Sequence, residues 1–343
     1  MVKVSRFGSC TVAKVGGPEE LGAVLPEAVH DSETVIVKPN FVDRAPGTYT
    51  DPESLRMLFT ALESRIVVVE GHQLVRVLSE GEDGLRFEIK GKTRDWSWMH
   101  RGEWSHFEKN NDWGWFRDGP HWSHLKRLDR GYMDEKGFTE FDAEYVNVTD
   151  EVWGGDVADP VKVREIVEAR YSPLFDERLY GYMPEKLYRL RGSCLISYSK
   201  YKHYATFTLK YMFGLIPDPI RCWWHGPQNS RMSQSVIGVS KLYGSLFDVV
   251  GVHESLGGTP VAHPEGEITV PGFRYNLHEG LGVVGVGTDR VELDTVMCGL
   301  GSYPLSEAEY MTADIGELGC FSQELYEECR GCAGEWLPPM AES

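Results

Sequence analysis

The sequence of 343 residues predicts an α/β fold, in which helices flank a mostly parallel sheet and an aromatic-rich insertion interrupts the core. Short apolar runs, typical of buried parallel strands, recur along the chain. Segments with helical spacing or with helix-start residues separate these runs, as in βαβ units. The length suits one large domain with an insertion, or two modest domains.

The first βαβ unit lies between residues 33 and 70. Residues 33–38 and 65–70 are apolar runs that predict two buried strands. Thr50 is expected to cap the helix between them, with Glu53 three residues later completing a capping box and Pro52 in the first turn. Strand, helix and strand in this order predict a parallel pair.

Tryptophan dominates the next part of the chain. Most of the ten tryptophans lie between residues 73 and 153. We interpret residues 73–130 as an insertion, in which residues 85–90 alternate apolar and polar side chains like a hairpin strand. The insertion is expected to act either as a lid over a site or as a contact between subunits. The α/β core would then comprise residues 1–72 and 131–320, and residues 321–343 would form a cysteine-containing tail.

The second half of the core repeats the α/β rhythm. Asp159 and Pro160 predict the start of a helix that runs to about residue 170. The apolar runs at residues 193–199, 247–252 and 281–286 predict three more core strands. Residues 206–213 predict a helix that ends at Gly214, ahead of two prolines.

Charge and targeting signals limit the partners. The net charge of −17 disfavours binding to nucleic acid and to anionic membrane surfaces. The chain has no apolar run of about 18 residues that would span a bilayer, and its first residues lack the features of a signal peptide. We therefore expect a cytoplasmic protein, whose seven cysteines are thiols or metal ligands rather than disulfides.

Several short motifs stand in a distinctive order. Residues 37–40 (Val-Lys-Pro-Asn) end a predicted strand, and residues 50–52 (Thr-Asp-Pro) open a helix. Residues 200–214 join a lysine- and histidine-bearing strand end to a helix that closes on Phe-Gly. Glycines at 257 and 258 and an Asp-x-x-x-x-Asp element at 289–294 follow.

This order resembles the family catalogued as domain of unknown function 362, over residues 33–320 apart from the insertion. The chain has Tyr211 where that family usually has Asn. The resemblance implies an α/β fold. It implies little about the chemistry, because the family is largely uncharacterised. Redox chemistry is favoured because many members carry an iron–sulfur module, although this chain lacks the dense cysteine runs of such a module. A fainter similarity runs to nickel-pincer lactate racemases, in which a lysine precedes a metal-binding histidine, as Lys210 precedes His225 here.

A basic cluster forms the main candidate site, with Lys200, Lys202, His203, Lys210 and His225 as candidate catalytic residues. The predicted strand end places the first of them at the carboxyl edge of the sheet, where open α/β sheets bind ligands. Basic side chains there suit a carboxylate or phosphate substrate. A lysine serves as a base if burial lowers its pKa, and a histidine serves as acid, base or ligand. The alternative is a solvated helix start with an ordinary buried histidine.

Two further motifs are expected to bind substrate. Lys38 and Asn40 follow the first predicted strand and belong to the opening motif of the resemblance. Gly257 and Gly258 form a loop in which a substrate can approach backbone amides.

Four carboxylates stand near predicted strand ends: Asp248, Glu254, Asp289 and Asp294. If they converge at one edge of the sheet, they can bind a divalent cation such as Mg²⁺ or orient the lysines. We take Asp289 and Asp294 as supporting substrate-binding residues. The alternative is that both carboxylates belong to a helix, as the residue that starts it and as an ordinary side chain along it.

Cysteines near the end of the chain suggest a metal site. Cys329 and Cys332 have the spacing of metal ligands, and Cys320 would supply a third thiolate. A fourth would come from Cys10, Cys222 or Cys298. The alternative is a surface tail with free thiols.

Together these features predict an enzyme that acts on a small anionic molecule. Oxidoreductase chemistry linked to an iron–sulfur cluster or a divalent metal is the first expectation, with an electron-donor protein or a second copy of the chain as partner. A metal-dependent racemase or isomerase is the second. The third is a non-catalytic partner protein that uses the tryptophan-rich insertion as its interface.

Overall fold

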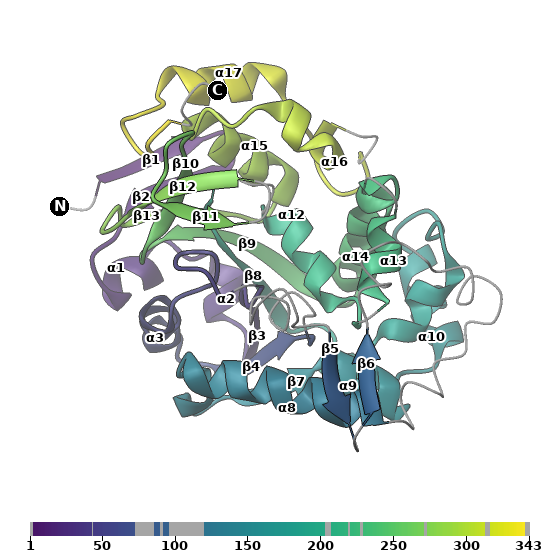
Figure 1. Ribbon diagram of the computed structural model, residues 1–343. Helices are drawn as coiled ribbons and strands as arrows, with labels where there is room; N and C mark the ends of the chain where they lie inside the picture. The colour runs from purple at the N-terminus through teal and green to yellow at the C-terminus, as the bar shows by residue number, and fades with distance from the viewer. Residues whose placement is uncertain are drawn as a thin grey trace.

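The fold is built on a sheet of eight strands in the order β1-β2-β13-β9-β8-β3-β4-β7 (Figure 1). The computed structural model describes residues 3–42, 44–72, 86–89, 92–95, 120–202, 207–218, 220–226, 229–270, 273–312 and 316–339. In sheet order the strands are β1 (Lys3–Phe7), β2 (Cys10–Lys14), β13 (Val283–Gly287), β9 (Asp248–Ser255), β8 (Cys194–Lys200), β3 (Thr34–Lys38), β4 (Arg65–Glu70) and β7 (Glu144–Asn147).

The strands from β9 to β7 all run parallel. Along the chain, β3 is followed by β4 and then β7, which extend the sheet on one side of β3. The next strands, β8 and β9, extend it on the other side of β3. The direction of winding therefore reverses between β3 and β8. In a doubly wound sheet this reversal opens a crevice at the carboxyl ends of the two strands.

The remaining strands extend the sheet in antiparallel fashion. β13 pairs antiparallel with both β9 and β2, and β2 pairs antiparallel with β1. A small sheet of β10 (Thr259–Ala262), β12 (Phe273–His278) and β11 (Ile268–Val270) follows β9, and β5 (Arg86–Ile89) pairs with β6 (Lys92–Asp95). The mostly parallel α/β fold and the five core strands predicted from apolar runs are confirmed, and so is the hairpin strand predicted near residue 87.

Helices cover both faces of the sheet. One face carries α1 (Pro18–Gly22), α2 (Glu27–His30), α3 (Pro52–Ala61), α8 (Pro120–Glu135) and the 3₁₀ helix η1 (Phe138–Glu140). Leu55 and Leu58 of α3 are buried against Val35 and Val37 of β3 in this core. Apolar residues at helical spacing therefore place α3 directly beside the crevice.

The opposite face carries most of the remaining helices: α9 (Val148–Gly154), α10 (Pro160–Glu168), η2 (Glu177–Tyr182), α11 (Glu185–Arg189), α12 (Thr208–Tyr211), η3 (Met212–Leu215), α13 (Arg221–His225), α14 (Met232–Leu246), α15 (Arg290–Leu300), η5 (Leu305–Glu307), α16 (Glu309–Thr312) and α17 (Gln323–Gly331). α14 is the longest of these, and its buried face includes Val236, Val239 and Leu242. α17 packs across α15, at the top of Figure 1.

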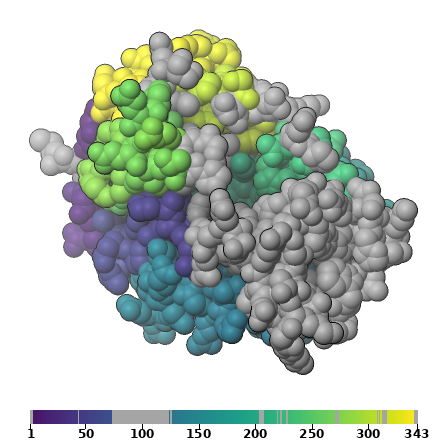
Figure 2. Space-filling view, in the orientation of Figure 1, coloured from purple at the N-terminus to yellow at the C-terminus, as the bar shows by residue number. Residues whose placement is uncertain are grey.

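Two predicted segment boundaries fall within or beside packed elements. Residue 130 falls inside α8, whose Tyr132 and Met133 are buried in the core beneath it. In the predicted C-terminal segment, α17 and Trp336 are packed in the core formed by β2, α15 and α17. Figure 2 shows this C-terminal segment (yellow) adjoining the N-terminal strands (purple). Most of the predicted insertion lies outside the described residues, apart from β5, β6 and the residues of α8.

The predicted capping box at the start of α3 is wrong. α3 begins at Pro52 with Asp51 as its N-cap, and no side chain caps it. Thr50 instead accepts a hydrogen bond through Oγ1 from the backbone N–H of Asn40, at 2.8 Å. The side chain of Asp51 is engaged elsewhere, as described below. Among the described residues, no helix is both long and apolar enough to cross a membrane.

Candidate functional site

Three predicted lysines lie near the carboxyl ends of β3 and β8, where the winding direction of the sheet reverses. Lys38 ends β3, Lys200 ends β8, and Lys202 lies two residues further on. Each is at most 1% exposed. Ammonium groups are seldom buried unless they are paired, so the partners of these lysines define the site.

Lys38 is paired with Glu70, the last residue of the neighbouring strand β4. The Lys38 Nζ lies 2.8 Å from Glu70 Oε2 and donates to the carbonyl oxygen of Pro39 at 2.7 Å. Gly214 of η3 packs directly on this pair, since a Cβ at that position would lie 2.9 Å from the lysine Nζ. A glycine is therefore required where the predicted helix after β8 ends.

Lys200 is held by two carboxylates. Its Nζ lies 2.5 Å from Asp51 Oδ2 and 3.5 Å from Glu254 Oε1, at the end of β9. Burial opposes the charged form of Lys200, but Glu254 and Asp51 outweigh burial and raise the pKa of the lysine. Burial raises the pKa of the Glu254 carboxyl. A Cβ on Gly257 would lie 2.1 Å from Asp51 Oδ2, so this loop glycine admits the carboxylate.

Tyr211 lies among these lysines. Its hydroxyl accepts a hydrogen bond from the backbone N–H of Lys200 at 3.0 Å and donates to the carbonyl oxygen of Lys200 at 3.2 Å. The ammonium groups of Lys38 and Lys202 lie 5.6 and 5.7 Å from the centre of its ring, within the range of a cation–π contact. The tyrosine that departs from the resemblance thus fixes the end of β8 and borders both ammonium groups.

Asn40 contributes an oxygen without a partner to this edge. Its Nδ2 donates to the carbonyl oxygen of Thr48 at 2.5 Å, and Lys202 Nζ donates to the same oxygen at 2.7 Å. The Asn40 side chain is fully buried, and its Oδ1 has no hydrogen-bond partner within the described part of the chain. A buried oxygen of this kind is suited to accept a hydrogen bond from a bound molecule.

Lys210 differs from the other lysines of this edge. It lies on α12, next to Tyr211 and four residues before Gly214 of the 3₁₀ helix η3. Burial lowers its pKa to about 8, and no charged group opposes that shift. No residue of the described ranges forms a hydrogen bond or ion pair with it. Its amine is therefore partly unprotonated near neutral pH, as general bases and nucleophiles require.

Of the two predicted histidines, His203 lies outside the described residues. His225 ends α13, where its ring meets Phe213 edge-on at 4.5 Å and its Nδ1 lies 3.4 Å from Asn229 Oδ1. Its predicted partnership with Lys210 thus stays a prediction.

The four predicted carboxylates do not converge. Glu254 is at the carboxyl edge, but Asp248 begins β9 and Asp289 follows the antiparallel β13, which places both at the amino edge. Asp289 caps α15 by accepting from the N–H groups of Val291 and Glu292, both at 2.9 Å. The condition for a shared cation site is therefore not met by these two carboxylates, and Asp289 takes the alternative role of starting a helix. The direction of β13 is not encoded in its apolar run.

Asp294 holds the start of α12. Its fully buried carboxylate accepts from the N–H and hydroxyl of Thr208, at 2.8 and 2.6 Å, and from the N–H of Leu209 at 3.0 Å. His253 Nε2 lies 3.3 Å from the same carboxylate. Asp294 therefore positions the helix that carries Lys210. Gly258, the remaining predicted residue, packs against Leu277 and Glu279.

The predicted cysteine ligands do not form a metal site. Cys329 is fully buried between α17 and α15, and burial raises the pKa of its thiol to about 12. Cys332 caps α17 and Cys320 is exposed. Within the described ranges, no three His, Cys, Asp or Glu side chains are grouped to hold a metal ion.

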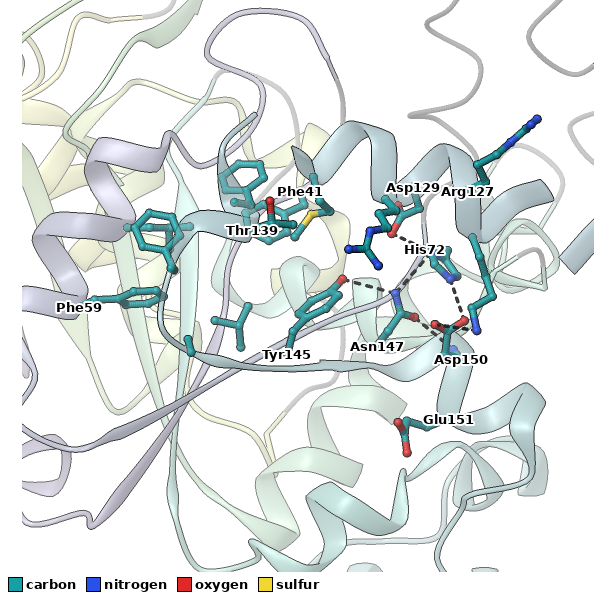
Figure 3. A pocket seen from close by; sticks show the side chains of 18 residues that line it. Phe41, Phe59, His72, Arg127, Asp129, Thr139, Tyr145, Asn147, Asp150 and Glu151 are labelled. Atoms are coloured by element: carbon teal, nitrogen blue, oxygen red, sulfur yellow. Dashed lines mark hydrogen bonds and ion pairs between the residues drawn. The ribbon is translucent and has the colours of Figure 1, made fainter. Parts of the chain in front are cut away.

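A cavity of about 690 Å³ lies at the same edge, beside the ends of β4 and β7 (Figure 3). One wall is apolar and includes Phe41, Phe59 and Phe138. The other is polar and includes Tyr145 and Asn147. Phe41 links this cavity to the lysine cluster, because its backbone N–H donates to Glu70 Oε2 at 3.4 Å. A molecule with an apolar body and a polar end fits such walls.

His72 is the central polar group of the cavity. Its Nδ1 lies 2.7 Å from Asp129 of α8 and its Nε2 lies 2.9 Å from Asp150 of α9, as the dashed lines in Figure 3 show. Burial alone would lower the pKa of His72, but Asp129 and Asp150 raise it to about 9. The imidazolium is therefore a fixed positive charge at neutral pH. Glu151 also lines the cavity, and its buried Oε2 has no hydrogen-bond partner in the described chain.

Sequence reasoning missed His72 and its two carboxylates. His72 follows a predicted strand by two residues, so the strand-end argument applied to Lys200 would have found it. Asp129 was assigned to the insertion, and Asp150 had no local signal. No protein-family model, no curated protein and no solved structure matches the chain.

Proposed function

We propose that the protein is an enzyme that binds a small anionic metabolite in the crevice between β3 and β8 and uses the amine of Lys210 as a base or nucleophile. The observation that carries the proposal is the unpaired Lys210, whose pKa burial lowers to about 8. Groups with such shifts concentrate at functional sites. The reaction class that suits a neutral amine is proton transfer or covalent addition at a carbonyl.

The surroundings of Lys210 support an anionic substrate. Ligands of doubly wound sheets bind where the winding direction reverses, and Lys38 and Lys202 border that crevice. Their ammonium groups favour a carboxylate or phosphate group. The unpartnered Oδ1 of Asn40 offers an acceptor for a hydroxyl or amide of the same molecule. The adjoining cavity has room for an apolar extension.

The test begins with the titration of Lys210. Competitive labelling with acetic anhydride over a pH series, read by peptide mass spectrometry, should give a midpoint near pH 8 for Lys210. Lys162 is exposed on α10 and serves as the comparison.

A second arm tests catalysis. The full-length chain is incubated with panels of small phosphate esters and carboxylates, and products are detected by mass spectrometry. Lys210→Met should lower the turnover of any hit by at least about a hundredfold, which is typical for the loss of an acid–base group. Lys162→Met should leave the turnover unchanged. A Lys210 that titrates like Lys162, or a Lys210→Met variant with full turnover, contradicts the proposal.

Iron–sulfur-linked redox chemistry and metal-dependent racemisation are the alternatives implied by the resemblance. Metal analysis and a visible spectrum of anaerobically purified protein separate them from lysine chemistry. A cluster or nickel at stoichiometric level favours those alternatives.

A further inference from the structure

A second cavity, of about 330 Å³, lies at the amino edge of the sheet, on the side opposite the proposed active site. The first residues of β9, the turn after β13 and the end of α14 border it. Its lining includes Arg170, Tyr171, Thr288 and Arg290. Nothing in the proposed function uses this cavity.

Arg290, the first residue of α15, is the unusual group in the lining. It is 5% exposed. Its Nη1 is enclosed, and its guanidinium forms no hydrogen bond or ion pair with any residue that the structure describes. Burial lowers the pKa of Arg290, but a guanidinium remains charged at every pH that a folded protein tolerates. A buried, unpaired charge destabilises a protein strongly unless a counterion is present.

The carboxylates closest to the cavity are occupied. Glu317 accepts from the N–H and hydroxyl of Ser172, at 2.7 and 2.6 Å, and is paired with Lys241. The carboxylate of Asp289 is bound by backbone N–H groups of α15 and of Cys320. Neither side chain is within ion-pair distance of Arg290.

Two other carboxylates have roles elsewhere. Asp294 lies one turn further along α15 and holds α12. Asp248 lines the cavity but is exposed to solvent. Asp294 and Asp289 favour the charge of Arg290 from a distance, but burial outweighs them. The cavity thus presents a guanidinium without a direct ionic partner in the described chain, together with Thr288 and Tyr171.

We propose that this amino-edge cavity binds the phosphate group of a small molecule, with Arg290 as its ionic partner. A guanidinium matches two phosphate oxygens through its fork of donors. Thr288 and Tyr171 of the lining carry hydroxyls that can donate to the remaining oxygens of a phosphate group. Inorganic phosphate and a phosphate ester share this chemistry, and the experiment separates them.

Isothermal titration calorimetry on the full chain is the test, with potassium phosphate, glycerol 3-phosphate and acetate as probes at constant ionic strength. The unmodified protein should bind phosphate saturably, and acetate should compete poorly. Arg290→Met should weaken phosphate binding at least about tenfold, as expected for a charge-assisted contact. Arg6→Met removes an exposed arginine of β1 and should change nothing. Tighter binding of glycerol 3-phosphate identifies an ester as the ligand.

Thermal unfolding supplies a second readout. Without phosphate, Arg290→Met should melt at or above the temperature of the unmodified protein, because the unpaired charge is gone. Phosphate should raise the melting temperature of the unmodified protein more than that of the variant. If Arg290→Met fails to fold, Thr288→Val takes its place in the titration.

Three results overturn the proposal. The first is an absence of saturable phosphate binding by the unmodified protein. The second is binding that survives Arg290→Met undiminished, which assigns the phosphate to the lysines of the carboxyl edge. The third is equal binding of acetate. Lys210→Met leaves the amino edge intact, so this variant should still bind one phosphate there. The double variant Lys210→Met/Arg290→Met should lose that site. The two proposals therefore fail separately.

Discussion

At the scale of single residues, the carboxyl edge holds an unusual number of buried charges, most of them paired. Lys38 with Glu70 and Lys200 with Asp51 and Glu254 are ion pairs in which removal of one partner would leave the other buried and uncompensated. Such pairs hold their partners in one geometry. Lys210 differs from these lysines, because burial lowers its pKa and no carboxylate offsets that effect.

His72 provides a test of this electrostatic arrangement. Its pKa is raised from 6.5 to about 9, mainly by Asp129. The ion pairs therefore stabilise the fold fully below pH 6.5, and this contribution is lost as the pH rises through about 9. The shift corresponds to roughly 3 kcal/mol. In urea titrations, the loss of unfolding free energy caused by His72→Gln should be larger at pH 6.5 than at pH 10 by about this amount.

The matched control is Val161→Ala, at an exposed apolar residue of α10. Since neither side chain titrates, its effect on the free energy of unfolding should not change appreciably with pH. A difference between the unmodified protein and His72→Gln that is constant from pH 6.5 to 10 would show that His72 is not charged in the folded state.

At the scale of elements, the C-terminal helix is locked onto α15 by a close approach at Gly299. A Cβ at Gly299 would lie 2.6 Å from Cys329 Cβ and 2.6 Å from the carbonyl oxygen of Tyr326. The cysteine pair that resembled a metal site is therefore part of a helix–helix contact. α15 also carries Arg290 in its first turn and Asp294 in its second, so one helix borders the amino-edge cavity and positions α12.

Gly299→Ala tests this contact. The added methyl should force α17 away from α15 and lower the free energy of unfolding by about 1–3 kcal/mol, as overpacking does. Gly331→Ala, at the end of α17, meets no atom within 4 Å and should be neutral or slightly stabilising. Urea denaturation of both variants measures the difference. Equal effects would mean that the helices do not approach as closely as described.

The elements that the sequence predicted best are those with one strong local signal. β3, β4 and β8 are apolar runs buried on both faces, and α10 begins at Asp159-Pro160 as expected. The start of α3 was misjudged because Thr50 and Asp51 are used by Asn40 and Lys200, far away in the sequence. Local rules cannot anticipate such long-range partners.

At the scale of the whole molecule, the sheet order decides which predicted residues meet. Lys38 and Lys200 were correctly predicted at strand ends, but only the return of the chain to the other side of β3 brings them together. Asp289 was assigned to the same edge, and the antiparallel direction of β13 sends it to the opposite one. Strand direction depends on the tertiary connections, which the sequence of a single strand does not encode.

A circular permutant tests the arrangement of the chain ends. Lys3 Nζ lies 4.3 Å above the ring of Trp336 and 3.5 Å from Glu335, so the two ends of the described chain meet. A chain that starts at residue 17 and carries residues 1–16 after its C-terminus, joined by a short Gly/Ser linker, should reach the same melting temperature within a few degrees. A control permutant opened between residues 284 and 285, inside β13, should fail to fold. Failure of the first permutant would contradict this packing.

The strand hairpin of β1 and β2 has a consequence for biosynthesis. β2 needs β13 as its second neighbour, and Val15 donates its backbone N–H to Gly282 at 2.8 Å. On the ribosome, the β1–β2 hairpin is translated long before β13, its second neighbour. Until β13 has been translated, one edge of β2 is unpaired and the side chain of Val12 lacks part of its apolar surroundings, so this hairpin is expected to be a binding site for chaperones during that interval.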